Sequence, residues 1–312
     1  MNFLKEKEKN MWLIYSILTA LIWGTAELFY KKGAKPDEKY SHLKITICVG
    51  LVMGIHALYT LIAENVDYNF MNLVKYLPVS MLYILSMSCS YFGMRFLAES
   101  ISDPIENTAG AITAILCFFI LKQTMSSLAL VSVILIVIGV VLLGIFEAKD
   151  VNGRTKSLGK KLAIISFCMP FLYAILDATG SFLDAYFLEL ETSPLLNVTE
   201  ANIELVANIS YELTFLIVAI ILMIFIKIKK EKLELINQKD KILAAVLETA
   251  GQFTYVFAMS GNAIIAAPII SSVCVVSVIL SRIFLKEKLT QNQYAAIAIV
   301  ILGILMLSVT DV

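Results

Sequence analysis

Apolar residues gather into ten long runs along this chain, and short polar segments separate them. Each run has about 17 residues or more, enough to cross roughly 30 Å of hydrocarbon as a helix. They are too long and continuous to be the strands of a membrane barrel, which alternate over about ten residues. The pattern therefore predicts an all-α integral membrane protein with ten transmembrane helices. The runs cover about residues 11–30, 43–63, 73–98, 105–121, 127–147, 161–188, 204–227, 241–260, 266–284 and 291–309.

Composition supports this prediction and narrows the class of protein. Of 312 residues, 59% are hydrophobic and 16% charged, whereas soluble domains are about half apolar and about a quarter charged. The connections between the runs are too short for a soluble domain, and the chain has no G-x-x-x-x-G-K-[ST] nucleotide-binding loop. We therefore expect neither an ATP-driven pump nor a cofactor. Because basic and acidic residues are equal in number, at 25 each, net charge does not favour a nucleic-acid partner.

The sequence carries no recognisable catalytic or metal-binding pattern. All five cysteines lie in apolar runs, without a C-x-x-C or Cys/His spacing. No Ser/His/Asp set occurs either, so we expect no enzyme, no catalytic residue and no metal site.

Lysine and arginine residues gather on one side of the predicted bundle. The side that carries both termini has five of them, and the opposite side has 19, in residues 31–44, 149–161, 227–241 and 282–288. Cytoplasmic loops are the ones enriched in these residues. We therefore expect a multi-pass protein of a plasma membrane, such as a bacterial inner membrane, with both termini outside.

The second half of the chain repeats the first. A shift of 164 residues places Asn107 on Ser271, Gly139 on Gly303, and ILKQTMS (120–126) on FLKEKLT (284–290). We divide the chain into a first repeat at 1–147, a loop at 148–160 and a second repeat at 161–312. Two copies of a five-helix unit must enter the membrane from opposite sides. This is the inverted-repeat plan of secondary transporters, whose substrate site lies near the midplane.

The end of the chain resembles a known family. The stretch LKEKLTQNQYAAIAIVILG (285–303) is similar to the closing signature of each half in the drug/metabolite transporter superfamily, in particular its EamA-type members. That signature reads L-G-E-x-L-T-x-x-Q-x-x-G-x-x-x-x-x-x-G, and Lys286 and Ala296 replace two of its glycines. In the first half, only Leu121 and Gly139 of the signature are kept. The resemblance implies a proton-coupled or exchange-type carrier of small polar metabolites. It also implies a central cavity lined by the first, third, fourth, sixth, eighth and ninth helices, but no particular substrate.

Polar residues at membrane depth share helix faces. A carboxylate at a helix centre costs about 2.5–3.5 kcal/mol on insertion scales and usually faces a bundle interior or a cavity. Glu248, Gln252 and Tyr255 recur at helical spacing, and Tyr173, Asp177 and Ser181 do the same on another run. Asp184 continues the second face nearer the helix end.

The first and fourth runs supply further candidates with ordinary alternatives. Glu27 follows Trp23 by one turn, but Lys31 is placed at i+4 to pair with it at the interface. Glu106 and Asn107 could line the mouth of a cavity or simply cap the start of their helix. For Glu212 and His56 we favour structural pairing or interfacial exposure. The residues that we expect to contact substrate are Trp23, Glu27, Tyr91, Glu106, Asn107, Tyr173, Asp177, Ser181, Gln252, Tyr255 and Ser271.

The sign of the buried charge indicates the substrate class. Apart from basic residues within two positions of a run's end, the runs hold one cation, Arg95, against the carboxylates of Glu27, Asp177, Asp184, Glu212 and Glu248. Acidic and aromatic side chains together suit a cation or zwitterion, such as an amino acid or a quaternary amine. We therefore predict a secondary active transporter that works by alternating access, with Asp177 and Glu248 as candidate proton-coupling residues.

Two alternatives remain open from the sequence alone. One is a carrier of an anionic metabolite, such as a sugar phosphate or nucleotide sugar, if Arg95 turns into the cavity. The other is a channel or structural membrane protein. The expected partners are a small-molecule substrate, protons and the lipid bilayer, with no nucleic acid, and a monomer is sufficient.

Overall fold

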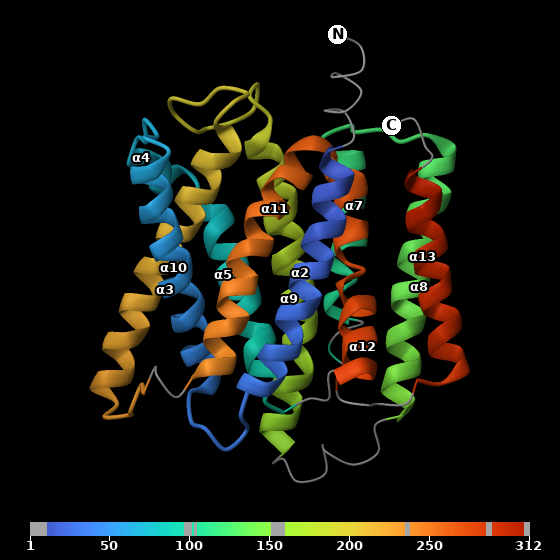
Figure 1. Cartoon of the computed structure of the whole chain (residues 1–312), viewed down its shortest axis with the longest axis horizontal. Helices are drawn as coiled ribbons and strands as arrows, with labels where there is room; N and C mark the ends of the chain where they lie inside the picture. Colours follow the sequence, from blue (N-terminus) through green and yellow to red (C-terminus); the bar gives the residue numbers. More distant parts are fainter. Residues whose placement is uncertain are drawn as a thin grey trace.

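The protein is a bundle of helices that run roughly along one common direction (Figure 1). The structure, a computed structural model, describes residues 11–96, 102, 105–150, 160–234, 238–284 and 289–308, and within these ranges it contains helices and no strand. The helices are α2 (Met11–Gly33), α3 (Ser41–Ala63), α4 (Met71–Lys75), α5 (Leu77–Gly93), α7 (Ala109–Phe119), α8 (Ser127–Asp150), α9 (Lys160–Leu188), α10 (Ile203–Ile228), α11 (Lys239–Ile270), α12 (Val273–Phe284) and α13 (Gln291–Ser308).

All ten predicted apolar runs fall on helices within the described residues, but three runs are divided. The fourth is interrupted by a turn at residues 107–108. The third begins as the short α4 and restarts at α5, where Pro78 lies in the first turn. Proline suits that position because the first turn of a helix leaves its backbone N–H groups unpaired in any case. The ninth run is split between the end of α11 and α12, and α11 bends at Asn262, which has non-helical backbone angles (φ −164°, ψ 77°).

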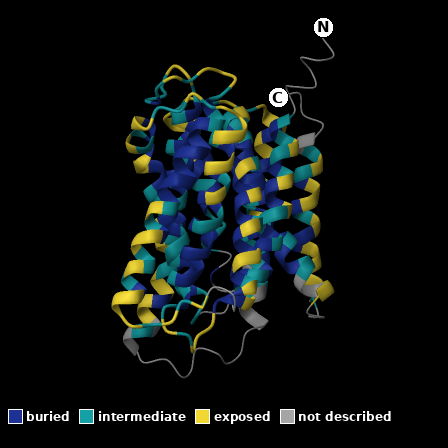
Figure 2. Ribbon diagram, turned by 60° about the vertical axis from the view of Figure 1, so that its left-hand side comes forward, coloured by how far each residue is buried: buried dark blue, intermediate teal, exposed yellow. Residues whose placement is uncertain are grey.

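The outward sides of the helices are apolar, as lipid contact requires. Exposed residues line the outside of the bundle along its height (Figure 2), and large apolar side chains such as Ile62 (81% exposed) and Ile55 (70%) are among them. A soluble monomer rarely exposes so much contiguous apolar surface. Among the residues that the structure describes, five helices are long and apolar enough to cross a membrane, by length and composition: α2, α3, α9, α10 and α11.

Glycines let neighbouring helices approach closely. α8 packs along α13, and the contact is reciprocal. A Cβ added at Gly139 would lie 2.5 Å from Val300 Cγ2, and one added at Gly303 would lie 2.8 Å from Ile136 Cγ1. These are the two glycines that the internal repeat superposes. The other long pairings are α2 with α11, α3 with α10, and α5 with α9.

Two helices begin in the middle of the bundle. A turn at residues 107–108 precedes α7, and a turn at residues 271–272 precedes α12. The two turns meet, because the backbone N–H of Gly110 donates to Ser271 Oγ over 3.1 Å. A Cβ at Gly110 would lie only 2.1 Å from that oxygen, so only glycine allows this approach. We call α7 and α12, each with the turn before it, the interrupted helices, and they border the cavity described below.

Candidate substrate cavity

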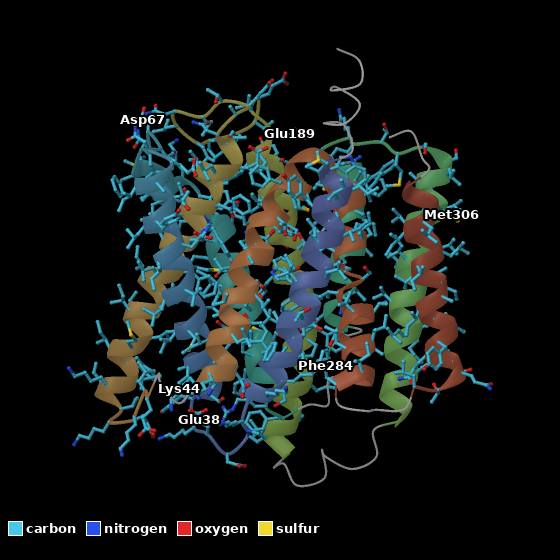
Figure 3. The ribbon with its side chains drawn as sticks, in the orientation of Figure 1. Glu38, Lys44, Asp67, Glu189, Phe284 and Met306 are labelled. Atoms are coloured by element: carbon cyan, nitrogen blue, oxygen red, sulfur yellow. The ribbon has the colours of Figure 1, made fainter. Side chains whose placement is uncertain are left out.

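A cavity of about 130 Å³ lies at the centre of the bundle, among α2, α5, α7, α9, α10, α11 and α12. The structure brings together all eleven residues that the sequence suggested as substrate contacts, and Glu248 joins them in the lining. On α2 the lining runs from Trp23 to Tyr30, and beside α5 it runs from Tyr83 to Met94. Both directions lead toward the end of the bundle where the α2–α3 connection lies, which Figure 3 marks with Glu38 and Lys44.

Glu248 is held by two residues of α2. Its Oε2 accepts a hydrogen bond from the Tyr30 hydroxyl over 3.2 Å, and its backbone carbonyl accepts one from Trp23 Nε1 over 3.2 Å. The Tyr30 ring also packs on Tyr91, with 4.9 Å between ring centroids. The carboxylate is therefore oriented from α2 although α11 carries it, and only 8% of Glu248 is exposed.

Three hydroxyl groups meet in the lining of the cavity. The Tyr83 and Tyr255 hydroxyl oxygens are 2.5 Å apart, and they lie 3.2 Å and 2.9 Å from Ser181 Oγ. The indole of Trp23 stacks on Tyr255, with 5.2 Å between ring centroids. We call Tyr83, Tyr255 and Ser181 the hydroxyl layer. It joins α5, α9 and α11 across the bundle.

Asp177 and Tyr173 form the α9 wall. The Asp177 carboxyl interacts with the side chains of Tyr173 and Ser86. Tyr173 lines the same space as Asp177, Glu106, Glu248 and Glu27, so four carboxyl groups and this tyrosine border a single cavity. In this way residues far apart in the sequence converge on one cavity of about 130 Å³.

The wall near the interrupted helices carries a second set of polar groups. Glu106 is 9% exposed and its Oε2 accepts a hydrogen bond from Ser90 Oγ over 2.8 Å. Asn107 and Ser271 border the same space. Glu106 therefore lines the cavity rather than the bundle surface.

The lining is acidic and aromatic. Glu27, Glu106, Asp177 and Glu248 contribute carboxyl groups, and among the described residues that line the cavity none is lysine, arginine or histidine. Carboxylates attract a cation by charge, and aromatic faces attract it through the ring quadrupole. Chemically, the carboxyl and aromatic groups can hold a small positively charged group. The carboxyl groups can also bind protons.

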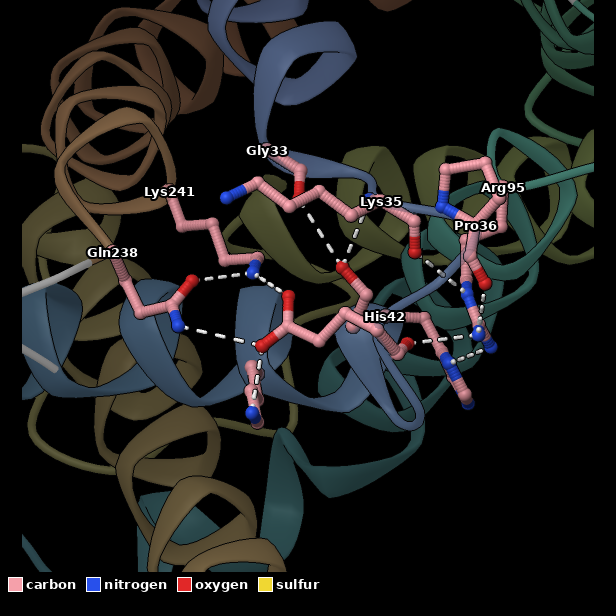
Figure 4. Close-up of polar contacts among 10 residues, drawn as sticks. Gly33, Lys35, Pro36, His42, Arg95, Gln238 and Lys241 are labelled. Atoms are coloured by element: carbon pink, nitrogen blue, oxygen red, sulfur yellow. Dashed lines mark hydrogen bonds and ion pairs between the residues drawn. The ribbon is translucent and has the colours of Figure 1, made fainter. Parts of the chain in front are cut away.

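Arg95 lies outside this lining and holds the α2–α3 connection instead (Figure 4). Its guanidinium donates to the backbone carbonyls of Glu38 over 2.8 Å and Pro36 over 3.3 Å. Desolvation lowers the pKa of Arg95. The charge that an anionic substrate would need is thus engaged with the backbone.

Beside Arg95, Glu38 ties the same connection to α11. Lys241 Nζ lies 2.5 Å and Lys44 Nζ 2.6 Å from its carboxylate oxygens, and Gln238 donates to it over 3.3 Å. Burial alone would raise the pKa of Glu38, but the hydrogen bonds from the two lysines outweigh it and lower that pKa to about 2. This polar cluster fixes the end of the bundle toward which the cavity extends.

The cavity also contains residues that the sequence had not suggested as contacts. Tyr30, Tyr83 and Tyr211 line it, as do Met87 and Met94. The spacing of Tyr76, Tyr83 and Ser90, seven residues apart each time, is a helical stripe that could have pointed to Tyr83. No comparable signal marks Tyr211, because it lies next to Glu212 on a helix expected to be peripheral.

Three other polar residues lie apart from the cavity. His56 Nδ1 is 2.8 Å from Glu212 Oε2, which agrees with the structural pairing that we favoured for both. Asp184 is fully buried and accepts a hydrogen bond from the Tyr76 hydroxyl. Neither the His56–Glu212 pair nor Asp184 contributes to the lining.

Comparisons with known proteins place these features in context. The sequence model of the EamA-like transporter family matches residues 10–145 and 211–309. An uncharacterized protein from Methanocaldococcus jannaschii is 36% identical over 99 residues, which cover 30% of this chain and 72% of that protein. A solved crystal structure is similar with a TM-score of 0.68, over 96% of this chain and 98% of that chain. Its sequence is 11% identical, so the likeness concerns the fold alone.

Proposed function

Because the chain belongs to the EamA-like transporter family and is thus a multi-pass membrane transporter of small solutes, we propose that it is a secondary carrier of a small organic cation or zwitterion. This family is part of the drug/metabolite transporter superfamily, whose members resemble the chain in its closing signature. Its members are transporters rather than enzymes. The finer proposal, a substrate with a positively charged group, comes from the cavity.

One observation carries the proposal: Asp177 and Glu248 border the same buried space as Trp23, Tyr173 and Tyr255, without a basic residue among the described lining residues. Ionised carboxylates are costly to bury unless a positive charge compensates them. A bound ammonium group or a bound proton would provide that compensation in turn. The aromatic rings add a surface that suits alkylated ammonium groups.

The volume of the cavity favours a small substrate. About 130 Å³ is close to the ~150 Å³ of a protein cavity that binds benzene, and below the ~300 Å³ at which pockets for drug-sized ligands begin. A nucleotide sugar would not fit such a space. An amino acid or a small amine would.

We also propose that protons exchange for substrate at Asp177 and Glu248. A carboxyl group that binds either a proton or a cation couples the two, because occupancy by one excludes the other. A proton gradient across the membrane would then drive the cation in the opposite direction. This requires both carboxyl groups to be reachable from the cavity, as their position in its lining allows.

The proposed transport cycle rests on two inverted five-helix repeats. The packing supports this plan: α2 on α11 corresponds to α9 on α5, and α12 beside α2 corresponds to α7 beside α9. The reciprocal glycine contact between α8 and α13 has the same symmetry. Rocking of one repeat against the other would open the cavity to each side in turn. The lysine-rich end, with Glu38 and Lys44, would face the cytoplasm.

A panel of ligands tested by thermal unfolding of the purified protein will examine the substrate class. The panel contains quaternary amines, polyamines, amino acids, nucleobases and sugar phosphates. A ligand at 100 times its Kd stabilises the folded state by about 2.7 kcal/mol. We expect stabilisation by compounds with a positively charged group, and loss of that stabilisation in Glu248→Gln and Asp177→Asn. The same two variants should abolish pH-driven uptake in proteoliposomes.

Glu212→Gln is the matched control, because Glu212 is also a buried carboxylate (1% exposed) but lies outside the cavity. It should keep the ligand response of the unsubstituted protein. Stabilisation by sugar phosphates alone would overturn the proposal in favour of an anion carrier. Wild-type proton coupling in both cavity variants would rule out the coupling mechanism.

A further inference from the structure

Asp184 occupies an unusual place one turn beyond the cavity. It follows Asp177 and Ser181 on α9 at helical spacing, so the three side chains share one face of the helix. Asp177 and Ser181 line the cavity, whereas Asp184 does not and is fully buried. From Asp184 the helix continues to the end of the bundle marked by Glu189 in Figure 3, opposite Glu38.

Only one oxygen of the Asp184 carboxyl group has a hydrogen-bond partner in the described part of the chain. Tyr76 donates its hydroxyl to Oδ1, and Oδ2 is buried with no partner among the described residues. A buried acceptor left unpaired costs free energy, and a carboxylate costs more than a neutral group. If Asp184 served only to receive the Tyr76 hydroxyl, a neutral amide would do so without a charge. The second oxygen is therefore available to a transient ligand.

Along α9, Ser181 of the hydroxyl layer lies between Asp177, which lines the cavity, and Asp184, which does not. Tyr83 and Tyr255, whose hydroxyls both contact Ser181 Oγ, line the cavity with it, whereas Asp184 does not. Because Ser181 accepts from both tyrosines, the layer is closed by side-chain hydroxyl groups alone. Such contacts can part through changes of side-chain rotamer, without unfolding of a helix. Asp177 is thus on the cavity side of the hydroxyl layer, and Asp184 is one turn beyond it on α9.

We propose that Asp184 is a second cation-binding site on the transport path, which receives the ammonium group of the substrate once the hydroxyl layer opens. This inference rests on the proposed function, since it takes the substrate to be a cation or zwitterion. Tyr76 orients one carboxylate oxygen and leaves the other to the ammonium group. Asp177 and Asp184 then form successive sites, one facing each end of the bundle.

Chemical access from each side of the membrane tests this site without knowledge of the substrate. In a variant whose five cysteines are replaced by alanine, Asp184→Cys is exposed to a membrane-impermeant thiosulfonate that carries a quaternary ammonium group. The reagent is applied to one side of sealed vesicles at a time. Ala185→Cys is the matched control, because Ala185 is its neighbour in the chain and is equally buried (3% exposed). Ser181→Cys reports access through the cavity.

We expect Asp184→Cys to react from the side opposite to the one that labels Ser181→Cys fastest. We also expect it to react about tenfold faster than Ala185→Cys, which only local unfolding would expose. Equal rates at positions 184 and 185, or access to position 184 only from the cavity side, would overturn the proposal. Neither outcome bears on whether cations stabilise the protein through Glu248, so the two proposals fail separately.

The unsubstituted protein provides a second measurement if the cysteine-free variant does not fold. A water-soluble carbodiimide and ethylenediamine, applied to one side at a time, convert accessible carboxyl groups to amides that mass spectrometry locates. Asp184 should be modified from the side opposite to the cavity and the buried Glu212 should not. Absence of modification at Asp184 from both sides would show that the site is closed to cations.

Discussion

The hydroxyl of Tyr30 donates to Oε2 of Glu248 over 3.2 Å, and this bond joins the last turns of α2 to the first third of α11. Because Tyr30 is only 3% exposed and packs on Tyr91, its position is fixed by the bundle. The carboxylate is thereby held toward the cavity before any ligand arrives. A carrier that binds cations at Glu248 should depend on this orientation.

Tyr30→Phe should weaken cation binding. Hydrogen bonds to charged groups contribute about 1.5–3 kcal/mol, so the Kd of a stabilising ligand should rise by roughly tenfold or more. Titration of the thermal shift with that ligand measures the change. Tyr294→Phe is the control, because Tyr294 lies on α13 and is 51% exposed. An unchanged Kd in Tyr30→Phe would mean that Glu248 does not rely on Tyr30.

Gly251→Ala should displace Trp23. The added methyl group would lie 2.2 Å from Trp23 Cδ1, so the indole must leave both the Glu248 carbonyl and the Tyr255 ring. Overpacking of this kind costs about 1–3 kcal/mol. We expect a lower melting temperature together with weaker cation binding. Gly93→Ala is the control, since its nearest neighbour, Met169 Cβ, is 3.7 Å away. Equal melting temperatures for the two variants would contradict this packing argument.

Much of this architecture follows from the sequence because lipid imposes strong rules. Helices must be long and apolar to span a bilayer, so the ten runs were readable. Polar residues must avoid lipid, so helical spacing alone grouped Glu248 with Gln252 and Asp177 with Ser181. All eleven suggested contacts line one cavity, while their roles in transport stay predictions.

The remaining features depend on which helices become neighbours, and periodicity does not encode this. The sequence offered Lys31 as a partner for Glu27; the structure adds that Lys31 donates to Ser277 of α12 over 3.2 Å and that Glu27 lines the cavity. Tyr30 donates to Glu248 of α11 and Tyr83 to Ser181 of α9, and both helices are far away in the chain. The Glu38 cluster, which consists of Glu38, Lys44, Gln238 and Lys241, joins the α2–α3 connection, α3 and α11. Such contacts between distant segments are set by tertiary packing.

The Glu38 cluster should make stability depend on pH. The pKa of the Glu38 carboxyl group is lowered to about 2 in the folded protein, from roughly 4.3 in an unfolded chain. The stabilisation is therefore complete above about pH 4.5 and is lost as the pH falls toward 2. In detergent, the melting temperature should decrease over this window in the unsubstituted protein, and Glu38→Gln should show a shallower decrease.

At neutral pH, Glu38→Gln should also lower stability by about 1–3 kcal/mol, because it leaves Lys241 and Lys44 without their carboxylate. Glu231→Gln removes the same charge from an exposed pair with Lys39, whose side chain is 65% exposed. Surface pairs contribute little, so this control should melt like the unsubstituted protein. A Glu38→Gln variant with the same pH profile as the control would show that the cluster does not stabilise the fold.

Tyr83→Phe should favour the state in which the hydroxyl layer is open. The substitution removes the hydroxyl that lies 2.5 Å from that of Tyr255 and 3.2 Å from Ser181 Oγ, and it keeps the ring. A hydrogen bond contributes about 0.5–1.5 kcal/mol, so the ratio of open to closed states should rise roughly two- to tenfold. Thiol labelling of Asp184→Cys should accelerate by that factor from the cavity side. Tyr211→Phe is a close control, because the Tyr211 ring packs on Tyr83 while its hydroxyl contacts only the Met87 sulfur at 3.5 Å among the described residues. If both variants change the labelling rate equally, general loosening of the aromatic wall, rather than the hydroxyl layer, controls access.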